Sequence, residues 1–480
     1  MMTDQEVNAL RATKKTQFFY GFGSISVGIK NNLLGTFLLI YYNQVLGLDA
    51  MLTASAMAIA LAFDAFSDPL IGIWSDRTKS RWGRRHPFMY FSIIPFSLAY
   101  YHILSDPGDI ASGELYARLV FWLIVLRMSM TLFEVPRSAL APELSKDYDQ
   151  RNTLAALGMM FGWLGGAGIA YIAQEFWLDS FLDLDGYQTL AFWGGVGIFI
   201  GSAVTCIGTH RNIPDLYQPP ARSLKVSVFF REAINTLSNR SWIVLFLSGS
   251  FYALLVGLET GVGTYYNEFF WQWKPTVIAP MSLITAVSVI TLVFFAPFIA
   301  EGRSKKKIAV GLFLTAIVVG PLPVALRLTD VYYGTSLIPE NGSDALWYIL
   351  AIHGASMSAL GALGFVFIGS MSMDIVEQVE QDTDRREEGL LGTINAFVHK
   401  LVGAGGVVLS GLIISYAGFD NPDATRADFY GGDVINNFAI IHLVVGVTLP
   451  FISTLLLLFY DIDRSKHNAH LSDLGYVEDK

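Results

Sequence analysis

Two carboxylates lie in a stretch of the sequence that is otherwise apolar. The segment LAFDAFSDPLIGIWSDRTKSRWGRRHP spans residues 61–87 and contains Asp64 and Asp68 ahead of its basic run. An ionised side chain at the centre of a bilayer costs about 2.5–3.5 kcal/mol on insertion scales, so such residues normally face a bundle interior and mark a pathway. Residues four apart share one helical face. Because like charges this close destabilise each other in a low dielectric, the spacing predicts a shared positive partner.

Three kinds of partner would satisfy this pair: a proton, a metal cation such as Na⁺ or Li⁺, or a basic side chain. Carboxylates are hard oxygen ligands that suit such cations, and they could equally share a proton. Pro69 follows Asp68 directly and removes a backbone hydrogen bond, which could free a carbonyl as a further ligand. The structural alternative is that Asp68 bonds polar groups of a neighbouring helix at this kink.

Further charged residues lie inside apolar runs. Glu134, in MTLFEVPRSALAPEL, has Thr131 one turn earlier and Arg137 one turn later, and Arg137 could simply neutralise it. Lys400, in NAFVHKLVGAGG, is flanked by small residues that permit close helix approach. It is a natural counter-ion for the carboxylates when a cation leaves. The remaining charges in such runs are Lys30, Arg127, Glu259 and Asp374.

The composition explains why these charges are unusual. The chain has 480 residues, of which 53% are hydrophobic and 15% charged, whereas a soluble domain has about 25% charged residues. This is the composition of a polytopic membrane protein. The single cysteine, Cys206, excludes an intrachain disulfide. The histidines are scattered and no nucleophile motif is present, so we expect no enzyme.

Apolar segments long enough to cross a bilayer as helices recur along the chain. Most of the 32 lysines and arginines lie in the two tails and in alternate connections, which predicts that both termini are cytoplasmic. The first segment is expected to act as an uncleaved signal. The twelve predicted spans lie near 17–46, 53–75, 87–105, 114–141, 152–177, 187–209, 241–269, 277–300, 307–328, 346–373, 388–416 and 435–460.

The longest predicted cytoplasmic connection divides these spans equally. It covers residues 210–240 and separates a six-helix bundle over 1–209 from another over 241–480. Basic runs follow the second and the eighth span, at 77–85 and 303–307. Basic runs at corresponding positions of the two halves favour parallel repeats related by an axis along the membrane normal, with a central cavity between the halves.

Four stretches resemble the glycoside–pentoside–hexuronide:cation symporters, the melibiose-permease branch of the major facilitator superfamily. DAFSDPLIGIWSDRTKSRWGRRHPF resembles the second helix and following loop, and YGFGSISVGIKNNLLGTFLLIYYNQVLGL the first helix. VPRSALAPELSKDYDQRNTL resembles the end of the fourth helix, and SMSMDIVEQVEQDTDRREEGLLGTINAFVHKLVGAGG the tenth-to-eleventh segment. The resemblance implies an all-α membrane protein with twelve transmembrane helices, two six-helix bundles and alternating access.

The resemblance also implies roles for individual residues. The family's coupling lysine on the eleventh helix matches Lys400, and its fourth-helix acid, also a sugar contact, matches Glu134. This sequence departs from the family's pattern at two sugar-binding positions. Gly28 aligns with the family's aspartate, and about Met159 aligns with its arginine. A melibiose-like galactoside is therefore not expected. The residues that match the family's cation site are Asp64, Ser67, Asp68, Thr131 and Glu134.

Other residues are candidates for the solute and for the gate. Lys30 and Arg137 could attract an anionic solute such as a hexuronide, although Lys30 could instead pair with Glu259. The aromatic residues that could stack on a sugar are Tyr20, Trp163, Tyr265 and Tyr266. The loop GIWSDRTKSRWGRR resembles the superfamily's cytoplasmic gate motif, and the simpler interpretation is a positive membrane anchor. The predicted gate residues are Asp76, Arg77, Arg84, Arg85 and Asp374.

These patterns together predict cation-coupled symport, driven by Na⁺ or H⁺, of a sugar, glycoside or hexuronide. The alternative is a carrier of a lysolipid or another amphiphilic solute on the same fold. We expect no cofactor beyond the transported ion and no nucleic-acid partner. We also expect a chain that works as a monomer in lipid, in the inner membrane of a bacterium.

Overall fold

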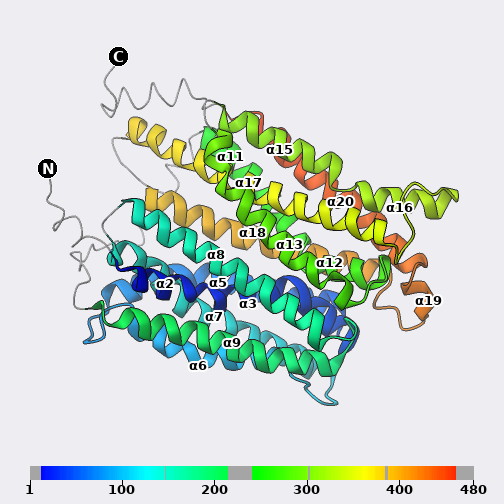
Figure 1. Cartoon of the computed structure of the whole chain (residues 1–480), viewed down its shortest axis with the longest axis horizontal. Coiled ribbons are helices and arrows are strands. Elements are labelled where there is room, and N and C mark those ends of the chain that lie inside the picture. The colour runs from blue at the N-terminus through cyan, green and yellow to red at the C-terminus, as the bar shows by residue number, and fades with distance from the viewer. Residues whose placement is uncertain (1–11, 146–147, 214–239, 301–302, 384–387, 461–480) are drawn as a thin grey trace. The chain divides into compact units, whose positions relative to one another are not determined.

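The computed structural model describes residues 12–145, 148–213, 240–300, 303–383 and 388–460, and all regular structure in these ranges is helical (Figure 1). Nine helices there are long and apolar enough to cross a membrane, or ten if one bent pair counts as a single span. Every predicted span overlaps a helix or a run of short helices. An all-α membrane protein is therefore confirmed as the fold class.

The helices of the first half begin with a broken span. Residues 14–45 form short α-helices alternating with π-helical turns, a feature that often accompanies functional sites. The elements of this half are α2 (Lys14–Phe22), α3 (Ser24–Asn32), η1 (Leu33–Phe37), α4 (Leu38–Ile40), η2 (Tyr41–Val45), α5 (Ala50–Arg77), α6 (His86–Leu104), α7 (Ser112–Leu144), α8 (Tyr148–Ile172), η3 (Ala173–Trp177) and α9 (Leu184–His210).

The second half contains one helix that continues well beyond its predicted span. The predicted tenth span, 346–373, belongs to α17, which has 40 residues. The elements are α11 (Arg240–Leu258), α12 (Val262–Tyr265), η5 (Tyr266–Phe270), α13 (Pro275–Phe294), α14 (Ala296–Ala300), α15 (Lys305–Val319), α16 (Leu322–Tyr333), α17 (Asp344–Thr383), α18 (Glu388–Ala417), α19 (Arg426–Phe429) and α20 (Asp433–Leu457).

The chain divides into two compact units. The first comprises 1–222 with 260–268 and 273–283, and the second comprises 223–259, 269–272 and 284–480. Helix α12 groups with the first unit, because Gly261 N donates to Gly35 O at 2.9 Å and Tyr265 Oη donates to Asn43 Oδ1 at 2.8 Å. The division at 1–209, 210–240 and 241–480 stays a prediction, and residues 214–239 of that connection lie outside the described ranges.

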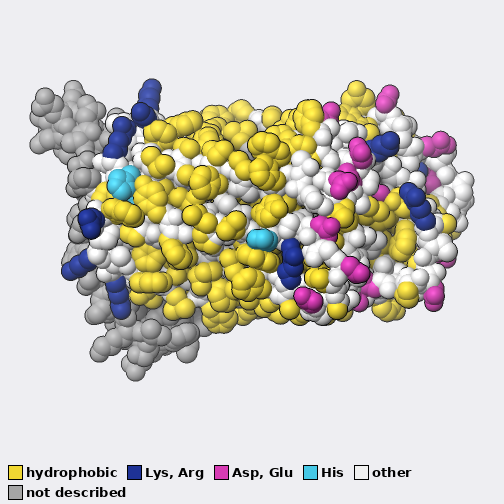
Figure 2. Space-filling view, turned by 90° about the horizontal axis from the view of Figure 1, so that it is seen from below, with side chains coloured by type: hydrophobic (Ala, Val, Ile, Leu, Met, Phe, Trp, Pro, Cys, Tyr) yellow, Lys and Arg dark blue, Asp and Glu magenta, His cyan; other side chains and the backbone are white. Residues whose placement is uncertain are grey.

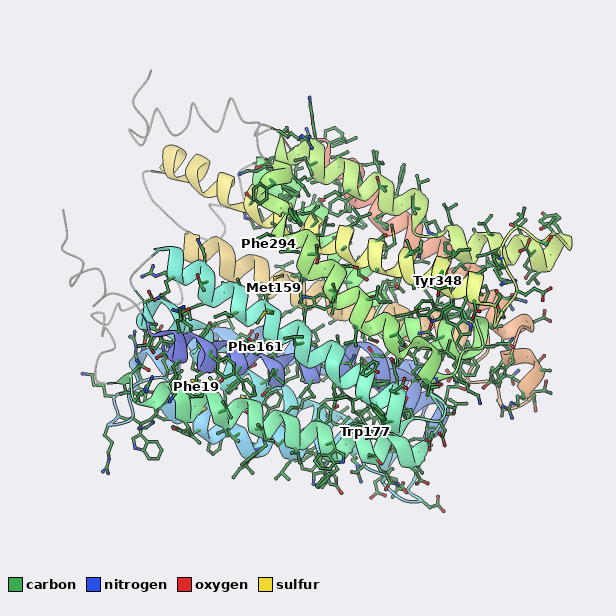
Figure 3. The ribbon with its side chains drawn as sticks, in the orientation of Figure 1. Phe19, Met159, Phe161, Trp177, Phe294 and Tyr348 are labelled. Carbon is green, nitrogen blue, oxygen red and sulfur yellow. The ribbon has the colours of Figure 1, made fainter. Side chains whose placement is uncertain are left out.

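The first unit packs its helices through small residues. Helix α6 packs against both α7 and α9, and α3 packs against α8. A Cβ on Gly28 would lie 2.0 Å from Gly162 O, and a Cβ on Gly165 would lie 2.5 Å from Ile25 O. The backbones of α3 and α8 are therefore in direct contact, as small residues allow between membrane helices. The Phe161 ring, labelled in Figure 3, adds an edge contact to Phe18 at 5.5 Å.

Helix α5 carries different residues on opposite faces. Asp49 caps its N-terminus, where Oδ1 accepts from Met51 N at 2.8 Å. The side chains of Phe66, Leu70 and Trp74, spaced four residues apart, are all more than half exposed. Exposed apolar side chains also cover the middle of the face drawn in Figure 2, with basic residues mainly toward one end and acidic residues toward the other. The face of α5 that carries Asp64 is turned to the protein interior, where Asp64 is fully buried.

Candidate functional site

The site is built where α5 packs against α7. Thr131 Oγ1 on α7 lies 2.9 Å from Asp64 Oδ1 and 2.8 Å from Asp68 Oδ1 on α5. Ser67 Oγ lies 3.4 Å from the same hydroxyl. Asp64, Ser67 and Thr131 are buried, while Asp68 is only partly buried. Four of the five residues predicted for the cation site thus meet around one hydroxyl group.

The Thr131 hydroxyl group cannot satisfy both carboxylates by itself. A hydroxyl carries one proton and two acceptor lone pairs. Thr131 Oγ1 therefore donates to only one of the two oxygens within 2.9 Å. The other contact becomes favourable when a carboxyl is protonated and donates to Oγ1, or when a cation joins the group.

Arg127 is a member of this site that the sequence analysis left without a role. Its Nη1 lies 3.4 Å from Asp64 Oδ2, and its side chain is 14% exposed. Two unit charges at about 4 Å attract by about 4 kcal/mol at an effective dielectric of 20, which offsets much of the roughly 2.5–3.5 kcal/mol that each of them costs in the bilayer. The ion pair ties α7 to α5. The available signal was its position four residues before Thr131, on the same face of α7.

Glu134 and Arg137 lie further along α7. Arg137 is buried, and its Nη1 donates to Tyr20 O at 3.2 Å. Its guanidinium group lies 5.2 Å from the centre of the Tyr20 ring and 5.9 Å from the centre of the Phe133 ring. Glu134 is partly buried, and the described contacts include no ion pair between it and Arg137. Arg137 therefore joins α7 to α2 instead of neutralising Glu134.

The remaining predicted solute contacts are spread over both units. In the first unit Lys30 on α3 is buried, Trp163 on α8 is partly buried and Tyr265 is fully buried. Lys400 on α18 and Glu259 belong to the second unit. Glu259 Oε1 lies 3.2 Å from His442 Nε2. The roles proposed for Lys30, Lys400 and Glu259 stay predictions.

Three of the five predicted gate residues cluster around Glu143, a carboxylate outside the predicted set. Glu143 Oε1 accepts from Arg84 Nη2 at 2.6 Å and from Arg85 Nε at 3.1 Å. Arg85 also pairs with Asp76 at 2.5 Å and donates to Ser75 Oγ at 2.7 Å. These contacts tie the ends of α5 and α7 to the start of α6.

Two predicted gate residues stand outside this cluster. Arg77, at the end of α5, is exposed. Asp374 lies within α17, and its side chain is outside what the structure describes. Gate roles for both stay predictions.

Replacing Glu143 by alanine is expected to destabilise the protein. The Glu143 side chain is 7% exposed, and its loss leaves the partly buried Arg84 and the buried Arg85 without their shared anion. Breaking a buried pair in this way costs about 3–5 kcal/mol of folding free energy. The measurement is the apparent melting temperature of the purified protein in detergent. The control is Glu114→Ala in the exposed first turn of α7, and equal melting temperatures for the two variants would contradict the prediction.

The helical fold and the charged cluster of Asp64, Asp68 and Arg127 between α5 and α7 define a polytopic membrane transporter. Among solved structures, the chain resembles a D-xylose–proton symporter with a TM-score of 0.61 at 12% identity, over 92% of this chain and 96% of the other. It also resembles a mutant of the nucleoside transporter NupG, with a TM-score of 0.60 at 12% identity, over 92% of this chain and all of the other. At this level of identity the likeness concerns the fold, which is that of the major facilitator superfamily.

Residues 19–464 match the family described as MFS/sugar transport protein, and the chain belongs to that family. The uncharacterized symporter YnaJ of Bacillus subtilis (strain 168) is 24% identical over 95% of this chain and 93% of its own length. The isoprimeverose transporter of Lactiplantibacillus pentosus is 24% identical over 93% of this chain and 88% of its own. The predicted symporter branch is thereby confirmed, as is the expectation of an integral membrane transporter and not an enzyme.

Proposed function

We propose that this chain is a cation-coupled symporter of a sugar or glycoside, with Na⁺ or H⁺ as the coupling ion. The observation that carries the proposal is the Thr131 hydroxyl group, which lies within 2.9 Å of both Asp64 and Asp68 at the packed interface of α5 and α7. A travelling cation completes this group of oxygens, with Ser67 and Glu134 beside it. The names of the relatives, a symporter and an isoprimeverose transporter, support the same function.

The site suggests how ion and solute are coupled. When the cation arrives, it neutralises the carboxylates and holds α5 against α7, which positions Glu134 for the solute. When the cation leaves, Lys400 serves as the counter-ion. A half-loaded carrier would bury an uncompensated charge, so only the empty or the fully loaded carrier reorients readily. Ion and solute then raise each other's affinity by the same factor, typically 5–150-fold.

The solute pocket proposed here includes basic and aromatic side chains. Lys30 and Arg137 give it positive charge that suits a hexuronide, and Tyr20 and Trp163 offer rings for a sugar face. Glu259 and Tyr265 complete the proposed set. We further propose that the protein works as a monomer in a bacterial inner membrane with both termini cytoplasmic, as the distribution of lysine and arginine favours.

A second candidate is a carrier of lysolipids. The sodium-dependent lysophosphatidylcholine symporter 1 of Gallus gallus is 23% identical over 94% of this chain and 87% of its own length. Uptake of a labelled lysophospholipid, with no uptake of any glycoside, would favour this candidate.

Membrane vesicles that contain the protein are expected to accumulate at least one member of a labelled glycoside and hexuronide panel, isoprimeverose included. The Na⁺ gradient and the pH gradient are imposed separately. Accumulation should occur only under the gradient of the coupling ion, because only that ion is carried together with the solute. Vesicles without the protein are the control. Uptake that ignores both gradients would contradict symport.

A further inference from the structure

We infer that Glu259 and His442 form a solute-binding site in the second unit. In this site the Glu259 carboxylate accepts hydrogen bonds from hydroxyl groups of the solute, and His442 positions that carboxylate. The inference rests on the proposed function, because it gives a task to one residue of the proposed solute pocket. It also adds His442, which lies outside the predicted set of solute contacts. His442 is a positioning residue, since it acts through Glu259.

The two residues meet because of the register in which α11 packs against α20. Elsewhere in this interface, Ser248 Oγ donates to Ser453 O and Ser453 Oγ donates to Ser248 O, each at 2.9 Å. Glu259 lies eleven residues after Ser248, and His442 lies eleven residues before Ser453. The helices are therefore antiparallel, and eleven residues are about three turns, or about 16 Å. The buried serine pair thus fixes the register that brings Glu259 to His442.

Glu259 is held where its helix ends. Its backbone N donates to Leu255 O at 2.9 Å, so helical geometry extends to Glu259, and Gly261 at φ 79° then breaks the helix. Glu259 Oε1 lies 3.2 Å from His442 Nε2. The ring of Phe438 stacks on the imidazole with centroids 5.9 Å apart. The imidazole is thus oriented by its own helix, and it in turn orients one oxygen of the carboxylate.

The pair lies deeper than the polar surface of the bilayer. His442 is nine residues from Asp433, where α20 begins, and fifteen residues from Leu457, where it ends. These separations correspond to about 13 and 22 Å along a helix. The polar interface on each side of the hydrocarbon core is only about 5–8 Å thick. Glu259 is therefore a carboxylate at the depth of the hydrocarbon.

The exposure of Glu259 at this depth indicates a path filled with water. Its side chain is 50% exposed, whereas that of His442 is 12% exposed. A charge exposed to lipid is costly, so charged side chains in spans face the bundle interior or a water-filled cavity. On α20 the exposed apolar residues Ile440 and Val444 mark the lipid face, and His442, two residues from each, lies on the other side of the helix. The exposed part of Glu259 therefore faces water, as a solute contact must.

The chemistry of this carboxylate suits a hydroxyl group. In the part of the chain that the structure describes, the side-chain contact of Glu259 is made by Oε1, which leaves Oε2 for the solute. An ionised carboxylate only accepts hydrogen bonds, and a hydroxyl group supplies the proton. Such bonds are roughly twice as strong as those between neutral groups. A polyhydroxylated solute such as a glycoside fits this site.

The first experiment tests whether Glu259 faces water, and it contains no solute. Glu259→Cys and Val444→Cys are made in a Cys206→Ser background, because Cys206 is the single cysteine of the chain. A charged methanethiosulfonate reagent, which reacts with ionised thiols in water, is added to unsealed membranes. Glu259→Cys is expected to react about 100-fold faster than Val444→Cys, the factor that corresponds to the cost of a charge in lipid. Equal rates would overturn the inference.

The second experiment measures initial uptake rates of the panel member that accumulates. Glu259→Ala is expected to raise KM by about tenfold or more, the loss expected for a hydrogen bond to a charged group, with a smaller change in the maximal rate. His442→Leu should raise KM in the same way. His442→Gln should restore the wild-type KM, because its amide nitrogen can take the place of Nε2. The matched control is Ser248→Ala in the same helix pair, which should lower the melting temperature and leave KM unchanged.

Two kinetic results would also contradict the inference. One is an unchanged KM in Glu259→Ala. The other is an equal rise of KM in His442→Leu, His442→Gln and Ser248→Ala, which would make the pair purely structural and which decides the matter even if Glu259→Ala does not fold. Failure of the whole panel would refute the proposed function, whereas the labelling rates, measured without any sugar, would still decide whether Glu259 faces water.

Discussion

Asp68→Asn is expected to abolish gradient-driven accumulation of the solute while leaving part of the exchange of solute across the membrane. The amide is neutral and nearly the same size, so the packing of α5 against α7 should persist. It cannot take up and release the travelling charge that Asp68 holds beside Thr131 Oγ1. The neutral site mimics the loaded carrier, which still reorients with solute bound. Accumulation should therefore fall by about tenfold or more, the scale of a coupling free energy of 1–3 kcal/mol.

The measurement compares accumulation against an imposed gradient with exchange between preloaded and external solute in the same vesicles. Asp64→Asn is the second site variant, and it removes the partner of Arg127 as well. Asp106→Asn is the matched control, since Asp106 lies in an exposed turn, where its Oδ1 accepts from Gly108 N at 2.8 Å. Undiminished accumulation by both Asp64→Asn and Asp68→Asn would refute the cation site.

Gly28→Asp is expected to prevent stable folding, although aspartate is the residue that aligns with this position in the melibiose-permease branch. A Cβ at position 28 would lie 2.0 Å from Gly162 O and 2.6 Å from Gly166 N. Both are backbone atoms of α8, so relief requires α3 and α8 to separate along their contact. Overpacking usually costs about 1–3 kcal/mol and more where backbone must move.

Gly28→Ala tests the same contact with the smallest possible side chain, and its apparent melting temperature should fall clearly below that of the wild type. Gly168→Ala is the matched control, because a Cβ there meets nothing within 4 Å. Alanine also has the higher helix propensity, so this control should keep or raise stability. Equal melting temperatures for Gly28→Ala and Gly168→Ala would show that α3 and α8 are not in backbone contact.

The Gly28 contact also bears on the choice of solute. A carboxylate at this position cannot hold sugar hydroxyl groups here, because the space belongs to the backbone of α8. Met159 on α8, labelled in Figure 3, stands near the family's arginine position. Its side chain is 45% exposed. We therefore expect that side chains other than those at positions 28 and 159 anchor the solute.

Much of the site was predictable from residues on single helices. The pair Asp64 and Asp68 stood out because a charge in lipid is costly, and helical periodicity alone places them on one face. The same periodicity placed Thr131 and Glu134 one turn apart. Apolar length gave the spans, and the excess of basic residues on alternate connections gave the predicted orientation. These properties are local, so neighbouring residues in the chain suffice to decide them.

The contacts between helices needed the tertiary structure. Arg127 was visible as a charge in a span, but only the rotation of α7 against α5 turns it toward Asp64. In the same way Arg137 lies against Tyr20 instead of Glu134, and Glu143 collects Arg84 and Arg85. Two helices can meet through several faces with similar apolar area, and close packing of small residues such as Gly28 selects one of them. The sequence by itself thus determined which residues must avoid lipid, whereas the packing of the helices decided which of them meet.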